Sequence, residues 1–251
     1  MIKIALCGHV ERIDREIEEK ILEIKDELNF CKFNWLLEQD NMSPFFSDVL
    51  SFNRGSVIEE MSSFFRQRKF DKDSLGIHVH FVNERGHIDT TYENQRNLIE
   101  KACEIFKERF KHKPKIFAGG WWYSDGNTDI ILSKLGFKYN LSHNNIKNYK
   151  EIRKNWFLGI IPTPIKVVVN EQKEIKNPRV KMIKNILKLS LDKCLEANWK
   201  SLLKTAMLLY EDEIIALPFH PHSLNSLKLE MIKETFKEIM KYKKVEFVAL
   251  K

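Results

Sequence analysis

Short apolar segments that fit β-strands alternate with helical patterns along almost the whole chain. The first is Ile2–Cys7, a mostly apolar run of strand length. Apolar residues at helical spacing, separated by charged residues, follow it: Ile13, Ile17, Ile21, Ile24 and Leu28. Because strands that alternate with helices normally form parallel crossover units, this pattern predicts a parallel β-sheet surrounded by helices.

The same alternation continues through the rest of the sequence. Further strands are predicted at Phe30–Leu37, Leu75–Phe81, Lys115–Phe117, Phe137–Leu141, Trp156–Val169, Ile214–Phe219 and Val245–Leu250. Helices are predicted at about 57–68, 91–111, 179–191, 198–210 and 224–240, and a short one stops at Gly136. Seven or eight mostly parallel strands in 251 residues fit an irregular (β/α) barrel, with a doubly wound open sheet as the main alternative. No Gly-, Pro- or Ser-rich linker divides the chain, so we expect one domain, 1–251.

The charge distribution argues against a nucleic-acid-binding protein. The net charge is +7, but the lysines are spread over the predicted helices, and only 109–115 and 241–244 are densely basic. Binding to nucleic acid needs a continuous basic stripe or a recognisable module. The sequence also has no glycine fingerprint for dinucleotides after its first strand and no P-loop.

The cysteines and the apolar segments exclude further classes of protein. The four cysteines lie far apart without C-x-x-C spacing, so neither a zinc finger nor a redox motif is predicted. No apolar run approaches the roughly 20 residues that span a bilayer, and the sequence starts on a strand rather than on a signal-peptide pattern. We therefore expect a cytoplasmic protein with no membrane span; the sequence does not determine its oligomeric state.

Polar side chains follow several of the predicted strands directly. His78 and His80 lie two residues apart on one strand, so they point to the same face and can approach one ion. Because the carboxyl ends of parallel barrel strands share one rim, other strand-end residues are expected beside them. These are His9, Glu11, Glu38, Asp40, His220 and His222, together with the segment Gly119-Gly-Trp-Trp-Tyr123. The sequence therefore predicts a polar site at this rim.

The sequence resembles the polysaccharide deacetylase family over about residues 1–225. That family opens with a strand followed by two acidic residues, and Ile4-Ala-Leu-Cys-Gly-His-Val-Glu11 occupies this place. Its second motif, which supplies metal-binding histidines, is matched by Gly76-Ile-His-Val-His80. The later motifs are matched by Phe117-Ala-Gly-Gly-Trp-Trp-Tyr123, Leu132-Ser-Lys-Leu-Gly-Phe-Lys-Tyr-Asn140 and Leu217-Pro-Phe-His-Pro221. The resemblance implies an irregular barrel of parallel strands.

The sequence departs from the family pattern at several positions. His9 stands where the family commonly has an aspartate that serves as base, and Glu11 aligns, with one residue of extra spacing, with the metal-binding aspartate. Val82 stands where members often have a second metal-binding histidine, so His80 would take that role. Ala118 replaces the arginine that is usual in the third motif.

The resemblance implies a metal-dependent hydrolase that removes an N-acetyl group from a sugar or glycan precursor. Glu11, His78 and His80 would bind a divalent metal, with zinc as the first choice, and leave positions open for water and substrate. His9 would accept the proton of the attacking water, and His220 would protonate the departing amine. The expected substrate-binding residues are Gly119 and Gly120, near the developing oxyanion, and Trp121, Trp122 and Tyr123, against the sugar ring.

Structural interpretations of the same residues remain open. Glu11 can be an acidic residue in a first helical turn, which the helix dipole favours, and His9 can cap local backbone groups. The aromatic trio can be core or loop packing. The alternative functions are a non-catalytic sugar-binding or scaffold protein on the same barrel, and a metal hydrolase of another amide or ester. The changes at His9 and Ala118 favour the non-catalytic protein, whereas the rim histidines favour a hydrolase.

Overall fold

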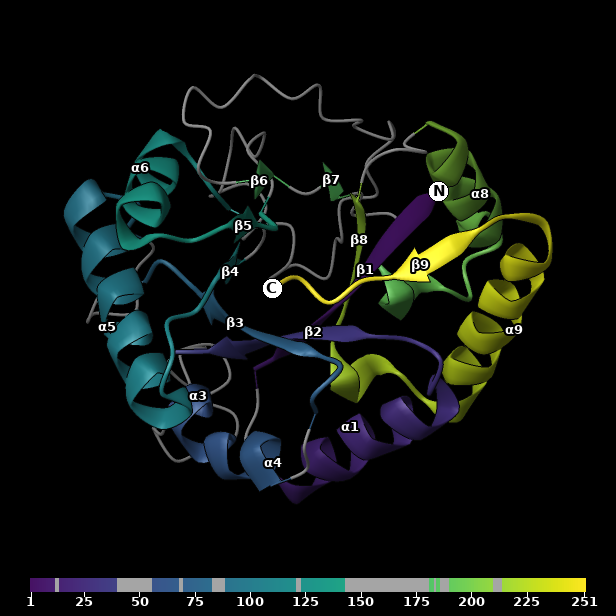
Figure 1. Ribbon diagram of the computed structural model, residues 1–251, viewed down its shortest axis with the longest axis horizontal. Coiled ribbons are helices and arrows are strands. Elements are labelled where there is room, and N and C mark those ends of the chain that lie inside the picture. Colours follow the sequence, from purple (N-terminus) through teal and green to yellow (C-terminus); the bar gives the residue numbers. More distant parts are fainter. Residues whose placement is uncertain are drawn as a thin grey trace, which may run out of the picture.

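A parallel β-sheet forms the centre of the computed structural model, and helices surround it (Figure 1). The structure describes residues 1–11, 14–39, 56–67, 70–82, 89–120, 123–142, 181–182, 184–185, 190–209 and 214–251. The predicted strand at Trp156–Val169 lies outside these residues. Within them, helices follow strands along the chain, as the sequence pattern indicated.

The described strands are joined in one nine-stranded sheet with parallel pairing throughout. The order is β6-β5-β4-β3-β2-β1-β8-β7, and β9 pairs with the start of β1. The strands are β1 (Ile2–Val10), β2 (Phe33–Glu38), β3 (Ser74–Val79), β4 (Ile116–Gly119), β5 (Tyr139–Asn140), β6 (Lys181–Met182), β7 (Lys184–Asn185), β8 (Ile214–Phe219) and β9 (Val245–Phe247). β6 and β7 stand at the two ends of this strand order, and position 183 alone separates them in the sequence. The first and last strands of the order therefore lie close together. The parallel sheet therefore curls as a barrel does, which confirms the predicted α/β class.

Local sequence signals mark the ends of several of the described helices. They are α1 (Arg15–Glu27), α3 (Val57–Glu60), α4 (Ser62–Gln67), α5 (Tyr92–Phe110), α6 (Gly126–Leu135), α8 (Trp199–Leu209) and α9 (Ser226–Tyr242), with 3₁₀ turns η3 (Leu191–Lys193) and η4 (Pro221–Ser223). Asp14, Thr91 and Asn225 cap α1, α5 and α9 through their side chains. Gly136, at φ 81°, ends α6 in the left-handed conformation that glycine adopts without strain. None of the described helices combines the length and the apolar composition needed to cross a bilayer.

The helix predicted at 179–191 is wrong. In the structure, Lys181–Met182 and Lys184–Asn185 are short strands, and only η3 follows them. These strands pair with β5 on one side and β8 on the other, so this segment connects two parts of the sheet. A short segment that mixes apolar and charged residues fits either periodicity, and here strand pairing decided the outcome.

The two faces of the sheet have different cores. The outer face packs against the helices through large apolar side chains, including Phe33, Trp35 and Phe117. The inner face carries a smaller cluster of mostly small or aliphatic residues: Ala5, Cys7, Leu36, Ile116, Ala118, Leu141, Ala216 and Leu250. The inner cluster fills the base of the barrel, and the carboxyl ends of the same strands lie above it.

A buried carboxylate connects β2 and β3 at the end of the sheet away from this rim. Asp73, whose side chain has no exposed surface, accepts hydrogen bonds from the Phe33 N–H at 3.1 Å and the Trp35 indole N–H at 3.0 Å. Lys25, from α1, donates to it at 2.7 Å. These contacts satisfy the charge in the interior, where an unpaired carboxylate is strongly unfavourable.

Asp73→Ala is therefore expected to lower the free energy of unfolding by about 3 kcal/mol, because it leaves buried donors unsatisfied. Chemical denaturation monitored by circular dichroism measures this change. Asp71→Ala, at an exposed position two residues earlier, is the matched control and should change stability by no more than about 0.5 kcal/mol. Equal effects of the two substitutions would contradict the role given to Asp73.

Candidate active site

The inner face of β1 changes from apolar to polar along its length. Ala5 and Cys7 belong to the small inner cluster, and His9 is the next residue on the same face. Glu11 follows directly after the strand, two residues beyond His9. On the neighbouring β8, Ala216 lies in the inner cluster and His220 follows the strand end. Strand alternation therefore carries polar side chains from separate strands to the mouth of one barrel.

Strand register sets the height of each polar residue along the barrel. The β2–β3 ladder pairs Glu38 with His78. The β1–β2 ladder pairs Val10 with Leu37, which brings Glu11, the next residue, level with Glu38. Glu11, Glu38 and His78 therefore form one level across three neighbouring strands.

The other histidines lie one level to either side. The β1–β8 ladder pairs Gly8 with Phe219, so the next residues, His9 and His220, are neighbours on the level below. Their ring centroids are 5.5 Å apart. His80 lies two residues beyond His78, about 6.6 Å further toward the rim. The predicted convergence of strand-end histidines is thus present.

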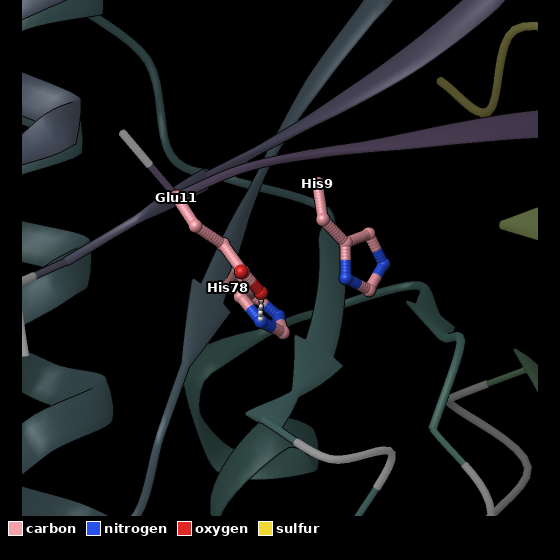
Figure 2. A group of neighbouring side chains, drawn as sticks. All are labelled: His9, Glu11 and His78. Atoms are coloured by element: carbon pink, nitrogen blue, oxygen red, sulfur yellow. Dashed lines mark hydrogen bonds and ion pairs between the residues drawn. The ribbon is translucent and has the colours of Figure 1, made fainter. Parts of the chain in front are cut away.

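The Glu11 carboxylate faces the His78 ring, and the His9 ring lies beside this pair (Figure 2). Oε1 of Glu11 is 3.1 Å from Nε2 of His78 and 3.6 Å from Nε2 of His220. Burial by itself would raise the pKa of Glu11, but His220, through its charge and its hydrogen bond, and then the neighbouring His78 hold that pKa well below its usual value. Glu11 is therefore a carboxylate in the folded protein.

The other ring nitrogen of His78 fixes how its imidazole faces Glu11. Nδ1 of His78 is 3.1 Å from the carbonyl oxygen of Ala118, which can only accept a hydrogen bond. The proton of a neutral His78 is therefore on Nδ1, and Nε2 presents a lone pair toward the Glu11 carboxylate. Two electron-pair donors that face each other in this way are favourable only with a proton or a cation beside them. Metal-binding histidines are commonly oriented by a backbone carbonyl in the same manner.

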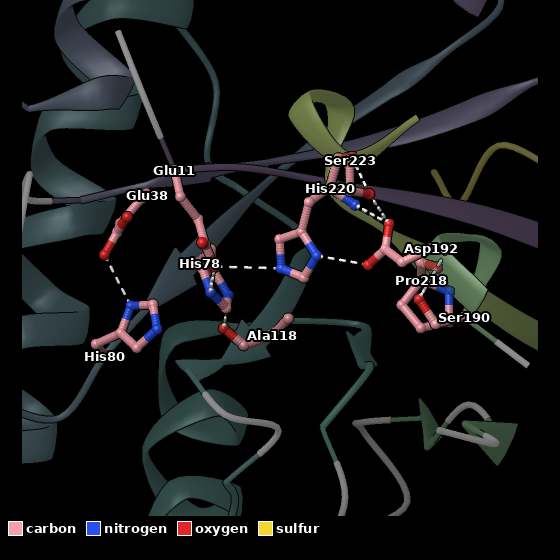
Figure 3. A network of polar contacts seen from close by, with 10 residues as sticks. All are labelled: Glu11, Glu38, His78, His80, Ala118, Ser190, Asp192, Pro218, His220 and Ser223. Atoms are coloured by element: carbon pink, nitrogen blue, oxygen red, sulfur yellow. Dashed lines mark hydrogen bonds and ion pairs between the residues drawn. The ribbon is translucent and has the colours of Figure 1, made fainter. Parts of the chain in front are cut away.

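His220 is paired with an aspartate that the sequence analysis missed. Nδ1 of His220 donates to Oδ2 of Asp192 at 2.7 Å, its backbone N–H donates to Oδ1 at 3.0 Å, and the Ser223 hydroxyl also donates to Asp192 (Figure 3). Burial would lower the pKa of His220, but the charge of Glu11 and the hydrogen bond to Asp192 outweigh burial and hold that pKa well above its usual value. Asp192 follows no predicted strand, and no motif in the sequence marks it.

His80 forms a second carboxylate–imidazole pair, with Glu38. The ring Nδ1 of His80 is 2.7 Å from Oε1 of Glu38, and the His80 ring makes an edge contact with the His78 ring at 4.7 Å between centroids. Figure 3 shows this pair on the opposite side of Glu11 from the His220–Asp192 pair. Burial, the largest influence, lowers the pKa of His80. The position of Glu38 after a predicted strand places it at the rim, but no motif assigns it a role.

Three of these side chains are close enough together to bind one cation. Donor atoms of His9, Glu11 and His78 all lie within 4.8 Å of one another. The His9 and His78 rings are 4.4 Å apart between centroids, and His9 is 2% exposed. Burial, followed by the neighbouring His78 and His220, lowers the pKa of His9 well below its usual value, which keeps it neutral as a ligand must be. Two imidazoles and a carboxylate suit a divalent ion such as zinc.

The structure gathers the predicted site residues only in part. Glu11 and His78 are together, as expected for a metal site, whereas the third donor that approaches them is His9 and not His80. His220 faces Glu11 from the neighbouring strand.

The predicted substrate-binding segment is described only in part. Trp121 and Trp122 lie outside the described residues. The N–H of Gly119 already donates to Ser142 Oγ at 2.7 Å, so it is occupied in this structure. The Tyr123 hydroxyl donates to Asp125 at 2.7 Å, and its ring makes an edge contact with Phe81. Gly120 packs directly on the His80 ring. The sugar-binding role of this segment stays a prediction.

Comparison with sequence families and with curated proteins finds no match. Solved structures do match over nearly the whole chain. A Mycobacterium smegmatis protein described as a polysaccharide deacetylase aligns with 99% of this chain and 87% of its own, at a TM-score of 0.60 and 12% sequence identity. A Puue allantoinase aligns with 98% of this chain and 87% of its own, at a TM-score of 0.55 and 12% identity.

A family 4 acetyl xylan esterase from Clostridium thermocellum, in complex with a cobalt ion, aligns with 98% of this chain and 87% of its own, at a TM-score of 0.50 and 10% identity. The further matches include a CE4 family pseudoenzyme from Bacillus anthracis, of which the chain covers 62%. At such low identity these likenesses establish the fold. The chain therefore has the fold of the polysaccharide deacetylases, as the sequence resemblance implied.

Proposed function

We propose that this protein is a metal-dependent hydrolase that removes an N-acetyl group from a sugar or glycan precursor. The observation that carries the proposal is the position of Glu11, which lies between His78, oriented by a backbone carbonyl, and His220, backed by Asp192. This combination provides donors for a cation and an acid beside it. The fold that holds it is shared with the Mycobacterium smegmatis protein described as a polysaccharide deacetylase.

The chain's own residues divide the chemistry of amide hydrolysis between them. Glu11 and His78 would hold a divalent cation, with zinc as our choice because a His/carboxylate donor set suits it. Such an ion supplies Lewis acidity toward the scissile carbonyl and lowers the pKa of water. His220, kept protonated by its two carboxylate neighbours, donates its Nε2 proton to the departing amine.

The attacking water also needs a proton acceptor. We propose that one of the two imidazoles beside His78 accepts this proton. They are His9, on the level below Glu11, and His80, on the level above it. Asp192 and Ser223 act indirectly, because they hold His220 in the orientation that points Nε2 toward Glu11. We propose that the segment from Gly119 to Tyr123 supports the sugar ring, as the family resemblance implies.

One other function has specific support, a non-catalytic sugar-binding protein on the same barrel. His9 and Ala118 stand where the family commonly has an aspartate and an arginine. A CE4 family pseudoenzyme is among the structures with this fold. The intact His220–Asp192 pair favours the hydrolase, because a binding protein does not require a carboxylate-backed imidazole next to its ligand.

Release of acetate from a panel of N-acetylated sugars tests the proposed activity directly. The purified protein is expected to release acetate, to lose this activity on removal of metal by a chelator, and to regain it on addition of Zn²⁺. His78→Ala should abolish both activity and metal content, because it removes a proposed ligand. Acetyl esters and other linear amides belong in the same panel. Hydrolysis of these alone would overturn the sugar assignment, and activity that survives both chelation and His78→Ala would overturn metal dependence.

Asp192→Asn tests the acid role of His220. The acid must be protonated, so activity falls as the pH rises through the pKa of His220. Asparagine removes the negative charge that raises this pKa, so the alkaline limb of the rate profile should move to lower pH, with kcat reduced by about 100-fold. Asp26→Asn, at an exposed position on α1, is the control and should leave the profile unchanged. An unshifted alkaline limb in the Asp192 variant would speak against His220 as the acid.

A further inference from the structure

We propose that His9, and not His80, is the third protein ligand of the metal, and that Glu38 holds His80 outside the coordination sphere. The inference rests on the proposed metal-dependent function and concerns only which of two imidazoles binds. The sequence resemblance implies that His80 is a ligand and His9 a base, and this proposal reverses the two roles.

The geometry of β1 supports His9. His9 and Glu11 lie two residues apart and face the barrel interior together. Donor atoms that bind one tetrahedral ion at about 2.1 Å lie about 3.4 Å apart. The donors of His9, Glu11 and His78 lie within 4.8 Å of one another, so side-chain adjustments of about 1 Å bring them to that spacing.

Three contacts fix the position of the His80 ring beside this cluster. Its Nδ1 is bonded to Glu38, whose side chain is only 5% exposed, at 2.7 Å. Its ring lies edge-on to His78. Its Cδ2 packs on Gly120, where a Cβ would lie 2.1 Å from that atom. A carboxylate behind Nδ1 is also found in many metal-binding histidines, so this bond does not exclude His80; the donor distances do, since His80 is absent from the three-residue cluster.

The result is a ligand set with one donor from β1, one from the residue directly after it, and one from β3. A His-x-Glu pair on one strand end supplies His9 and Glu11, and His78 completes the set from the third strand. Three protein ligands leave room for water and substrate, as catalytic zinc sites require. The departure from the family pattern at position 9 then preserves the metal site with a different ligand.

Calorimetric titration with Zn²⁺ alone tests the assignment without any substrate. The wild-type chain is expected to bind one Zn²⁺ at this site, and His9→Ala should weaken binding at least 100-fold. His80→Ala should change the affinity by less than fivefold. His112→Ala, at an exposed histidine distant in sequence from the cluster, controls for binding of Zn²⁺ to surface imidazoles and should have no effect.

Two further variants keep the test decisive if a buried alanine disturbs folding. Gly120→Ala should displace His80 without touching β1, and His9→Gln should retain a polar side chain of similar length at position 9. We expect Gly120→Ala to keep Zn²⁺ affinity within fivefold and His9→Gln to lose at least 100-fold, with circular dichroism confirming that both are folded. Gly126→Ala, where a Cβ meets nothing within 4 Å, is the matched glycine control.

The outcomes separate the two proposals. Strong Zn²⁺ binding by the wild type that is lost in the His80 and Gly120 variants but kept in the His9 variants would overturn the ligand assignment and leave the metal-dependent function intact. Retention of affinity in all of these variants would also overturn it. A wild-type chain that binds no Zn²⁺ would overturn metal dependence itself and the ligand assignment with it.

Discussion

The carboxylate of Glu11 lies 3.1 Å from Nε2 of His78 and 3.6 Å from Nε2 of His220 at the mouth of the barrel. A carboxylate in this position must be balanced by protons or by a cation, because burial alone would favour its neutral form. The imidazoles around it supply that balance. The same charge keeps His220 protonated, whereas the Ala118 carbonyl orients His78 so that its Nε2 faces Glu11. Glu11 and the imidazoles around it therefore form one electrostatically coupled cluster.

Small side chains below this cluster leave the space that it occupies in the barrel. Ala5, Cys7 and Ala216 line the inner face of β1 and β8, whereas the large aromatic residues lie outside, against the helices. Parallel strand register then places side chains from strands far apart in sequence at the same height. Because both features are properties of the backbone and the core, the positions of the histidines are set before any ligand binds.

Two positions at which the sequence differs from the family pattern, Ala118 and His9, both contact His78. Ala118 replaces an arginine side chain, yet its backbone carbonyl is the group that orients His78. His9 replaces an acidic residue and approaches the same imidazole at 4.4 Å between ring centroids. Two carboxylate-backed imidazoles, His80 with Glu38 and His220 with Asp192, flank this centre. The fold is shared with polysaccharide deacetylases, whereas the polar side chains at these positions differ from the family pattern.

The sequence by itself determined the strand and helix alternation, the parallel barrel class, and the presence of Glu11, His78 and His220 at one rim, because periodicity and strand ends are local properties of the chain. The sequence pattern predicted a helix at 179–191, and this was wrong because the strands that pair with this segment are distant in sequence. Only the tertiary structure decided that Asp192 supports His220, since 28 residues separate them and no local pattern connects them. Contacts between side chains depend on strand register and on the course of the loops, and neither is encoded in the periodicity of a single segment.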